Sequence, residues 1–294
     1  MGSLKTLATA GAVAMIATSA AFIAPAAAAD LMPPPMMAPP PPAMDLGGSG
    51  FYLRGDVGVG VQSSKGFHQD EVTAAGGSWL RSSMGDPAIM GVGVGYQINN
   101  FLRFDVTGEY RSKVEFKGVD RYSYTCTFAA GSCAAIGNII QRGNVWSGSH
   151  GAFVALVNGY IDLGTWNGLT PFVGAGIGSA YHMVRGVRDY DPSDLGGGGF
   201  SDDRSKWNLA WALHAGLAYD VTQNVKMELG YRYLNMGHAQ SGGMNCISPS
   251  GAACNYGPLK VRSIDSHDFR LGVRWMLGGS PAPVMAAAPL VRKY

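Results

Sequence analysis

Eight segments of the chain carry alternating apolar and polar side chains, or glycine-rich stretches of β character, over 10 to 14 residues each. At 101–111, for example, Leu102 and Phe104 alternate with Arg103 and Asp105. A period of two residues is typical of a β-strand whose two faces meet different surroundings. The pattern predicts strands at 51–62, 88–97, 101–111, 150–161, 170–183, 208–219, 224–235 and 267–277.

The connections between these segments alternate between long and short. The long connections are 63–87, 112–149, 184–207 and 236–266, and the short ones are 98–100, 162–169 and 220–223. Strands that run up and down place all long connections at one end, as in outer-membrane barrels with long outside loops and short periplasmic turns. The segment lengths also fit membrane-spanning strands of about 9–11 residues better than soluble strands of about 5–6. The sequence therefore predicts one all-β domain at 51–277, an eight-stranded antiparallel up-and-down transmembrane β-barrel.

Charged side chains share one face of the predicted strands. An arginine or lysine that faces lipid costs roughly 2–4 kcal/mol at the midplane of the membrane, so these charges are expected inside the barrel. A buried charge without a partner is costly, and we therefore expect ion pairs across the lumen. The predicted network consists of Arg54, Asp56, Arg103, Asp105, Glu109, Arg111, Lys226, Glu228, Arg232, Asp268, Arg270 and Arg274.

Aromatic residues lie on the opposite, apolar face, near both ends of the predicted strands. A membrane barrel is expected to carry two such belts, one at each interface. The belt at the short-turn end would contain Phe51, Tyr96, Tyr219 and Trp275. The belt at the long-loop end would contain Tyr110, Phe153, Tyr181, Trp211, Tyr231, Tyr233 and Phe269.

The two ends of the chain differ in composition from the predicted barrel. Lys5, an apolar stretch and the run Ala26–Ala29 follow the order of a secretory signal peptide, predicted at 1–29. A transmembrane helix is the alternative, but Pro25 interrupts the stretch and no charged stop-transfer segment follows. Residues 30–50 are predicted to be a proline-rich spacer, and 278–294 a Pro/Ala-rich tail. An even number of strands would leave both segments in the periplasm.

Overall composition argues against two classes of protein. Charged residues make up 14% of the chain and aromatic residues 10%, which argues against extensive disorder. The net charge of +2 offers no basic stripe for nucleic acid, so a nucleic-acid partner is not expected.

The four cysteines form two pairs that are close in sequence. An exported chain meets oxidising conditions, and disulfides are expected between Cys126 and Cys133 and between Cys246 and Cys254, each within a long connection. A metal site is the alternative, but the spacings lack the usual C-x-x-C or H-x₃-H pattern. No metal and no other cofactor is predicted.

Four segments, taken in order, resemble a known family. They are FYLRGDVGVG (51–60), PFVGAGIG (171–178), MELGYRYLNMG (227–237) and HDFRLGVRWML (267–277). They resemble the small outer-membrane β-barrels of Gram-negative bacteria known as outer-membrane immunogenic proteins or porin-family surface antigens, which share the eight-stranded plan of opacity-type proteins. The resemblance implies a place in the outer membrane, among its lipid and lipopolysaccharide. Such barrels commonly end at the last strand, whereas here residues follow Leu277, so either Trp275 or Tyr294 would be the assembly signal.

The function expected from these features is structural: membrane integrity and surface display of four long loops. An eight-stranded barrel has an interior just wide enough for side chains to fill it, so a channel is the less favoured reading. The resemblance adds an alternative, because some relatives bind haemin or contact hosts. Loop residues that could ligate or stack on a small ligand are Tyr122, Tyr124, His68, His238 and Met236.

An enzyme is not expected, although some barrels modify lipid. Ser266, His267 and Asp268 form the single compact cluster with the residue types of a hydrolase, and they are expected at a loop end. Neighbours on a strand point to opposite faces, so His267 cannot readily meet both flanking residues. His214 is expected to make a hydrogen bond in the lumen. The glycine run 196–199 is expected to be a flexible loop tip.

Overall fold

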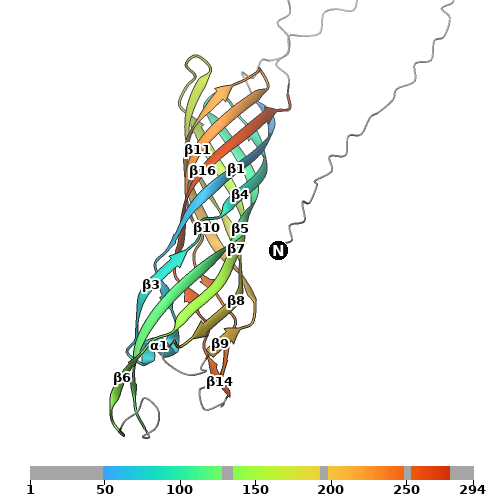
Figure 1. Ribbon diagram of the computed structural model, residues 1–294. Coiled ribbons are helices and arrows are strands. Elements are labelled where there is room, and N and C mark those ends of the chain that lie inside the picture. Colours follow the sequence, from blue (N-terminus) through green and yellow to red (C-terminus); the bar gives the residue numbers. More distant parts are fainter. Residues whose placement is uncertain (1–48, 128–134, 193–197, 248–252, 279–294) are drawn as a thin grey trace, which may run out of the picture. The chain divides into compact units, whose positions relative to one another are not determined.

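The computed structural model describes residues 49–127, 135–192, 198–247 and 253–278, and eight long strands in these ranges close into an antiparallel barrel (Figure 1). The pairing runs in chain order, and the last strand pairs with the first. The predicted eight-stranded up-and-down barrel is therefore confirmed. The barrel strands are β1 (Gly50–Ser64), β4 (Ala88–Gln97), β5 (Leu102–Thr125), β7 (Val145–Asp162), β8 (Leu169–Tyr190), β10 (Arg204–Asp220), β11 (Val225–Asn235) and β16 (Ile264–Met276).

Four barrel strands extend well past the predicted segments at the end that carries the long connections. β5 has 24 residues and β8 has 22, at least twice the length of about 9–11 residues that a membrane-spanning strand needs. The expectation that 112–149 and 184–207 are loops is wrong for these extensions. The pairing register shifts between Arg111 and Val114 and between Ser147 and Ser149. Such an irregularity breaks the period of two, so the alternation in the sequence stops at these positions although the strands continue.

Smaller elements fill the rest of the long-connection end, and Figure 1 shows α1, β3, β6, β9 and β14 gathered there. We call the described parts of 65–87, 113–149, 184–206 and 236–263 the crown. Its elements are β2 (Phe67–His68), α1 (Asp70–Ala74), β3 (Ser78–Met84), β6 (Ile139–Arg142), β9 (Gly198–Ser201), β12 (Ala239–Gln240), β13 (Met244–Ile247), β14 (Ala253–Tyr256) and β15 (Lys260–Val261).

Two crown elements depart from the sequence expectation. Gly198 and Gly199 belong to β9, which pairs with β8, so this part of the glycine run is strand and not a loop tip. The pairing places Gly199 directly opposite Asp189, where its missing side chain leaves room for that carboxylate. The helix α1 was not expected, and it begins where the side chain of Gln69 accepts a hydrogen bond from the Val72 amide at 2.8 Å.

Within the described ranges, no helix is long and apolar enough to cross a membrane.

The polar face of the barrel strands points inward and the apolar face points outward. Arg103 and Asp268 are 0% exposed, whereas Leu229 on a neighbouring strand is 60% exposed. The sequence-based prediction that the apolar face meets the lipid, made from the cost of placing arginine in lipid, therefore agrees with the fold.

The barrel interior also contains an apolar region that the sequence pattern did not reveal. Toward the crown, β7 turns Leu156 and Val154 inward, while β8 contributes Ala180 and β10 contributes Ala212. This cluster continues into the crown, where Trp146 and other large side chains are buried with it. The interior is thus charged toward the short turns and apolar toward the crown.

Aromatic side chains line the outer wall at both ends of the apolar band. At the crown end, register pairing connects Tyr110, Phe153, Tyr181 and Trp207 across four adjacent strands. We call these four residues the aromatic row; Trp207 was not among the predicted belt residues. Two of its contacts have ring centroids 5.0 Å and 4.8 Å apart. At the short-turn end, Phe51 packs against Tyr96 with centroids 4.9 Å apart.

Candidate functional site: the barrel interior and the crown

Glu228 lies at the centre of the first group of charges in the lumen. It projects inward from β11, and its carboxylate faces three arginines from three other strands. Arg274 Nε lies 3.1 Å from Glu228 Oε1, Arg54 Nη2 lies 3.5 Å from Oε2, and Arg103 Nη2 lies 3.6 Å from Oε1. Glu228 therefore compensates cations that the alternation of β1, β5 and β16 forces into the barrel.

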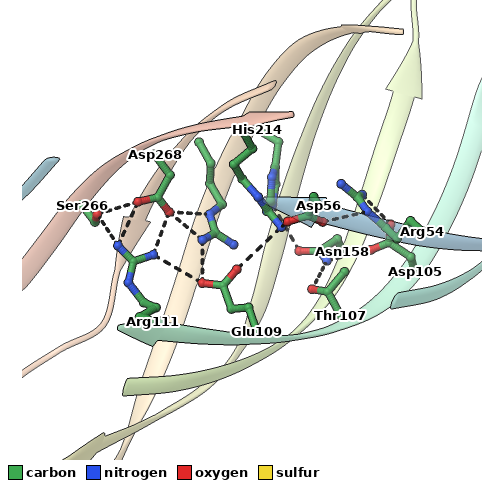
Figure 2. Close-up of polar contacts among 12 residues, drawn as sticks. Arg54, Asp56, Asp105, Thr107, Glu109, Arg111, Asn158, His214, Ser266 and Asp268 are labelled. Carbon is green, nitrogen blue, oxygen red and sulfur yellow. Dashed lines mark hydrogen bonds and ion pairs between the residues drawn. The ribbon is translucent and has the colours of Figure 1, made fainter. Parts of the chain in front are cut away.

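Asp268 and Glu109 form a second group nearer to the crown (Figure 2). Arg232 Nη2 lies 2.6 Å from Asp268 Oδ2 and 2.7 Å from Glu109 Oε1. Both Nη atoms of Arg111 donate to Asp268 at 2.9 Å, and Ser266 donates to the same carboxylate at 2.6 Å. A carboxylate held by two guanidiniums and a hydroxyl has its acceptor positions well satisfied.

Asp56 and Arg270 connect the two groups. Arg270 pairs with Asp56 and lies 3.7 Å from Glu109, while Arg54 lies 3.5 Å from Asp56 and 2.9 Å from Asp105. We call the connected set the lumen network. Its members are six arginines (Arg54, Arg103, Arg111, Arg232, Arg270 and Arg274) and six carboxylates (Asp56, Asp105, Glu109, Asp162, Glu228 and Asp268).

Sequence reasoning missed one member of this network and misplaced another residue. Asp162, assigned to a turn, is the last residue of β7 and pairs with Arg103 at 3.1 Å. With Asp162 included, the network is balanced in formal charge. Lys226, predicted in the network, instead pairs with Asp220 at 2.6 Å beside the turn at 221–224, where its side chain is 20% exposed. A strand boundary that shifted by one residue was enough to hide Asp162.

Neutral polar groups complete the lumen. Asn158 donates to Asp105 at 2.7 Å and to Thr107 at 3.0 Å, and its amide oxygen lies 3.1 Å from His214 Nε2 (Figure 2). His214 thus takes part in a hydrogen bond inside the barrel, as its strand position suggested. A cavity of about 20 Å³ remains beside Arg54, Tyr160, His214 and Glu228. That volume holds about one water molecule.

A chain of hydrogen bonds lies where the charged region meets the apolar region. His150 Nε2 lies 2.8 Å from His182 Nδ1, and His182 Nε2 lies 2.8 Å from the carbonyl oxygen of Met236. Gln62 lies 3.4 Å from the other nitrogen of His150. His182 reaches His150 from the neighbouring strand β8, whereas Gln62 reaches it from β1, which does not pair with β7. Together with the Met236 backbone, these partners hold the two rings in place.

The serine, histidine and aspartate of 266–268 do not form a hydrolytic triad. They lie within β16 and not at a loop end, because that strand begins two residues before Ser266. Ser266 and Asp268 point into the lumen, whereas His267 points outward and lies 2.7 Å from the hydroxyl of Tyr231. Alternation along the strand thus separates the base from the nucleophile.

The residues proposed for a small ligand lie on several elements of the crown, and His68 and the strand just after His238 belong to the same three-stranded sheet. His68 lies in β2, 2.9 Å from Asp70, while His238 lies just before β12, Met236 is buried below it, and Tyr122 is on β5. The side chain of Tyr124 lies outside the described residues. Burial and the carboxylate of Asp191 raise the pKa of Tyr122 to about 12, which disfavours the phenolate that would bind iron. The described residues contain no group of three His, Cys, Asp or Glu side chains suited to a metal ion.

Three of the four cysteines lie in the described parts of the crown. Cys246 on β13 is directly opposite Cys254 on β14 in an antiparallel pair. Cys126 is buried after the end of β5, and Cys133 lies outside the described residues. The two pairings stay predictions.

Asp189 is a titratable group in the crown with a shifted pKa. Two causes raise the pKa of Asp189 to about 6: burial, which has the larger effect, and the nearby carboxylate of Asp120. The folded protein then binds this proton more tightly than the unfolded chain, where an aspartate has a pKa of about 3.9. The contribution of Asp189 to stability is therefore favourable below about pH 4 and is lost as the pH rises through about 6.

We accordingly expect Asp189→Asn to raise the thermal unfolding midpoint at pH 7.5 and to leave it nearly unchanged at pH 4. Thermal unfolding followed by tryptophan fluorescence at the two pH values measures the difference between the variant and the parent protein. Asp203→Asn is the control, because the side chain of Asp203 is 60% exposed. A gain that is equal at both pH values would contradict the assignment.

Comparison with known proteins agrees with this geometry. A family model described as "Outer membrane protein beta-barrel domain" matches residues 14–276. An uncharacterized protein of Brucella abortus is 29% identical over 265 residues, which cover 77% of this chain and 84% of that protein. A Rickettsia prowazekii protein named as a candidate adhesin is 28% identical over 229 residues, covering 76% of this chain and 86% of that protein.

Solved structures with a similar fold include neisserial surface protein A. It is 19% identical in sequence, with a TM-score of 0.39, and the match covers 78% of this chain and 99% of that one.

Proposed function

The chain belongs to the outer membrane protein β-barrel domain family and lies in the cell outer membrane, and from this premise we propose that it is a closed barrel that displays its crown at the cell surface. Its role in this proposal is structural and interfacial. The barrel holds the crown at a fixed height and orientation, and the crown makes the contacts with other molecules.

The filled lumen is the observation that carries this proposal. Six arginines and six carboxylates cross-link the barrel strands from inside, and the apolar cluster fills the interior toward the crown. The cavity of about 20 Å³ in the charged region is far smaller than a path for a hydrated ion. These side chains support a scaffold rather than a channel.

The crown supports the second half of the proposal. It is built on extended barrel strands, with β8, β9, β13 and β14 forming a continuous sheet. The two predicted disulfides, Cys126–Cys133 and Cys246–Cys254, would pin its connections. A relative named as a candidate adhesin is consistent with a surface that contacts other molecules. Binding of haemin through the crown is not favoured, because burial raises the pKa of Tyr122 and because His68 is paired with Asp70.

Planar-bilayer recording tests the closed lumen. The refolded full-length protein is expected to give no stepwise conductance, while its unboiled form migrates faster on gels than its boiled form. Faster migration shows that the barrel is folded, so an absence of conductance in the bilayer cannot be attributed to unfolded protein. Regular open-channel steps from the fast-migrating species would overturn the proposal.

A further inference from the structure

We propose that the outer wall of the crown binds the phosphate groups of a phosphorylated glycolipid headgroup in the outer leaflet. The site is a row of side chains on β5, β7 and β8: Lys117, Ser147 and Arg188. This inference deepens the proposed function, because it rests on the crown standing above the outer leaflet.

Strand register places the three side chains in one line on one face. Lys117 pairs with Ser147, and Ser147 pairs with Arg188. All three are exposed, whereas their chain neighbours Phe116, Trp146 and Val187 are buried. Adjacent strands lie about 4.8 Å apart, so the two long cationic side chains can converge on one anion above the serine hydroxyl. We call Lys117, Ser147 and Arg188 the basic row.

The surroundings of the basic row add further positive charge. Lys113, Arg121 and Arg185 are exposed on the same strands. Two carboxylates compensate part of it: Glu115 lies 3.8 Å from Lys117, and Asp203 lies 3.9 Å from Arg185. Both pairs are exposed, with side chains between 58% and 80% accessible, and such pairs are weak. Their cations therefore stay available to a phosphate.

Height above the membrane identifies the class of ligand. Lys117 follows Tyr110 by seven residues, and Arg188 follows Tyr181 by seven, so the basic row runs parallel to the aromatic row. With strands tilted by about 45° and a rise of about 3.3 Å per residue, this separation is roughly 16 Å. Lys113 and Arg185 lie at intermediate heights of roughly 7–9 Å. The height spanned by these cations is greater than the height of a simple phospholipid headgroup. It matches phosphates that are carried on a sugar scaffold.

A hollow beside the basic row provides room for the sugars. It has a volume of about 510 Å³ and is lined by Ser147 and Arg188, by Tyr190 and Phe200, and also by Asp189. Phe200 is paired with Arg188 across the strands β8 and β9 and is 53% exposed. Exposed aromatic side chains next to a guanidinium suit a ligand with both apolar ring faces and anionic groups.

The opposite wall of the barrel is different. At the crown end of β11 and β16, the outer wall carries Tyr233 and Asp265, joined by a hydrogen bond of 3.0 Å, and His267. Lys65 and Arg262 are also exposed on this side, just after β1 and just before β16. The described barrel strands there carry a carboxylate, whereas β5, β7 and β8 carry a row of cations. We expect the glycolipid to bind on the β5–β7–β8 side.

Native mass spectrometry of the full-length protein in detergent, with added bisphosphorylated lipid A, tests the site. The expected result is that Lys117→Gln/Arg188→Gln weakens lipid A binding by about thirty-fold, as two cations near an anionic surface would. The matched control, Lys65→Gln/Arg262→Gln, removes two exposed cations from the β1–β16 side and is expected to change binding less than about twofold. Heat-modifiable migration confirms that each variant is folded.

Three outcomes would overturn the inference. Equal losses in the two double variants would assign binding to net charge. Equal binding of lipid A and its dephosphorylated form would exclude the phosphates. Competition by soluble glucosamine phosphate or inorganic phosphate at the affinity of lipid A would assign the site to a soluble ligand. None of these outcomes bears on conductance, so the closed-lumen proposal stands or fails separately.

Discussion

Glu228→Gln is expected to lower the free energy of unfolding by about 3–5 kcal/mol, the cost of removing one partner from a buried ion pair. The substitution keeps the size of the side chain but removes the negative charge that faces Arg54, Arg103 and Arg274. Three guanidiniums would then lie together in the closed lumen with less compensation. Urea unfolding of the refolded protein, followed by heat-modifiable migration, measures the change.

Glu115→Gln is the matched control for this prediction. It removes a carboxylate of the same type from the outer wall of the crown, where Glu115 is 80% exposed. A surface pair of this kind contributes about 0–1 kcal/mol, so its loss is expected to be small. Similar effects of the two substitutions would show that the lumen network does not hold the barrel together.

Gly178→Ala is expected to destabilise the barrel by about 2 kcal/mol, within the usual range for overpacking a tight interior. Gly178 faces the lumen from β8, and an added methyl group would collide with the backbone carbonyl of Ala155 and approach the Cα of Leu156 to 2.9 Å. Both obstacles are main-chain atoms of the neighbouring strand, so relief requires movement of the strands. Urea unfolding measures this effect as well.

Gly230→Ala provides the comparison in another lumen-facing strand position. A methyl group at Gly230 meets nothing within 4 Å. The alanine also reduces the freedom of the unfolded chain, so this variant is expected to be as stable as the parent or slightly more stable. A loss at position 230 as large as that at 178 would mean that the close approach of β7 and β8 is not the cause.

The barrel could be predicted from sequence because each membrane-spanning strand meets two environments of opposite polarity. Leu229 and Leu271 alternate with Glu228 and Arg270, and the cost of exposing such charges to lipid allows one assignment of the faces. The candidate lumen charges followed from the same alternation. Only Lys226, beside a short turn, lies apart from the predicted set.

The crown could not be predicted in the same way. The register shift after Arg111 interrupts the alternation, so the sequence pattern predicted that the strand ends at Arg111. In the structure, β5 continues and pairs with β7 again from Val114 to Val119. Short strands such as β9 and β13 have too few residues to show a period. Asp162 was missed for a related reason, since a strand boundary cannot be placed to one residue from polarity alone.

The local pattern of the chain determined by itself the eight strands, their order, the two faces of each and the end that carries the long connections. These features depend on residues next to one another in sequence and on the polarity of the surroundings. The partners in the lumen, the apolar region toward the crown and the line formed by Lys117, Ser147 and Arg188 were decided by the closed barrel. Each of them joins strands distant in sequence, and only the register of pairing sets which side chains meet.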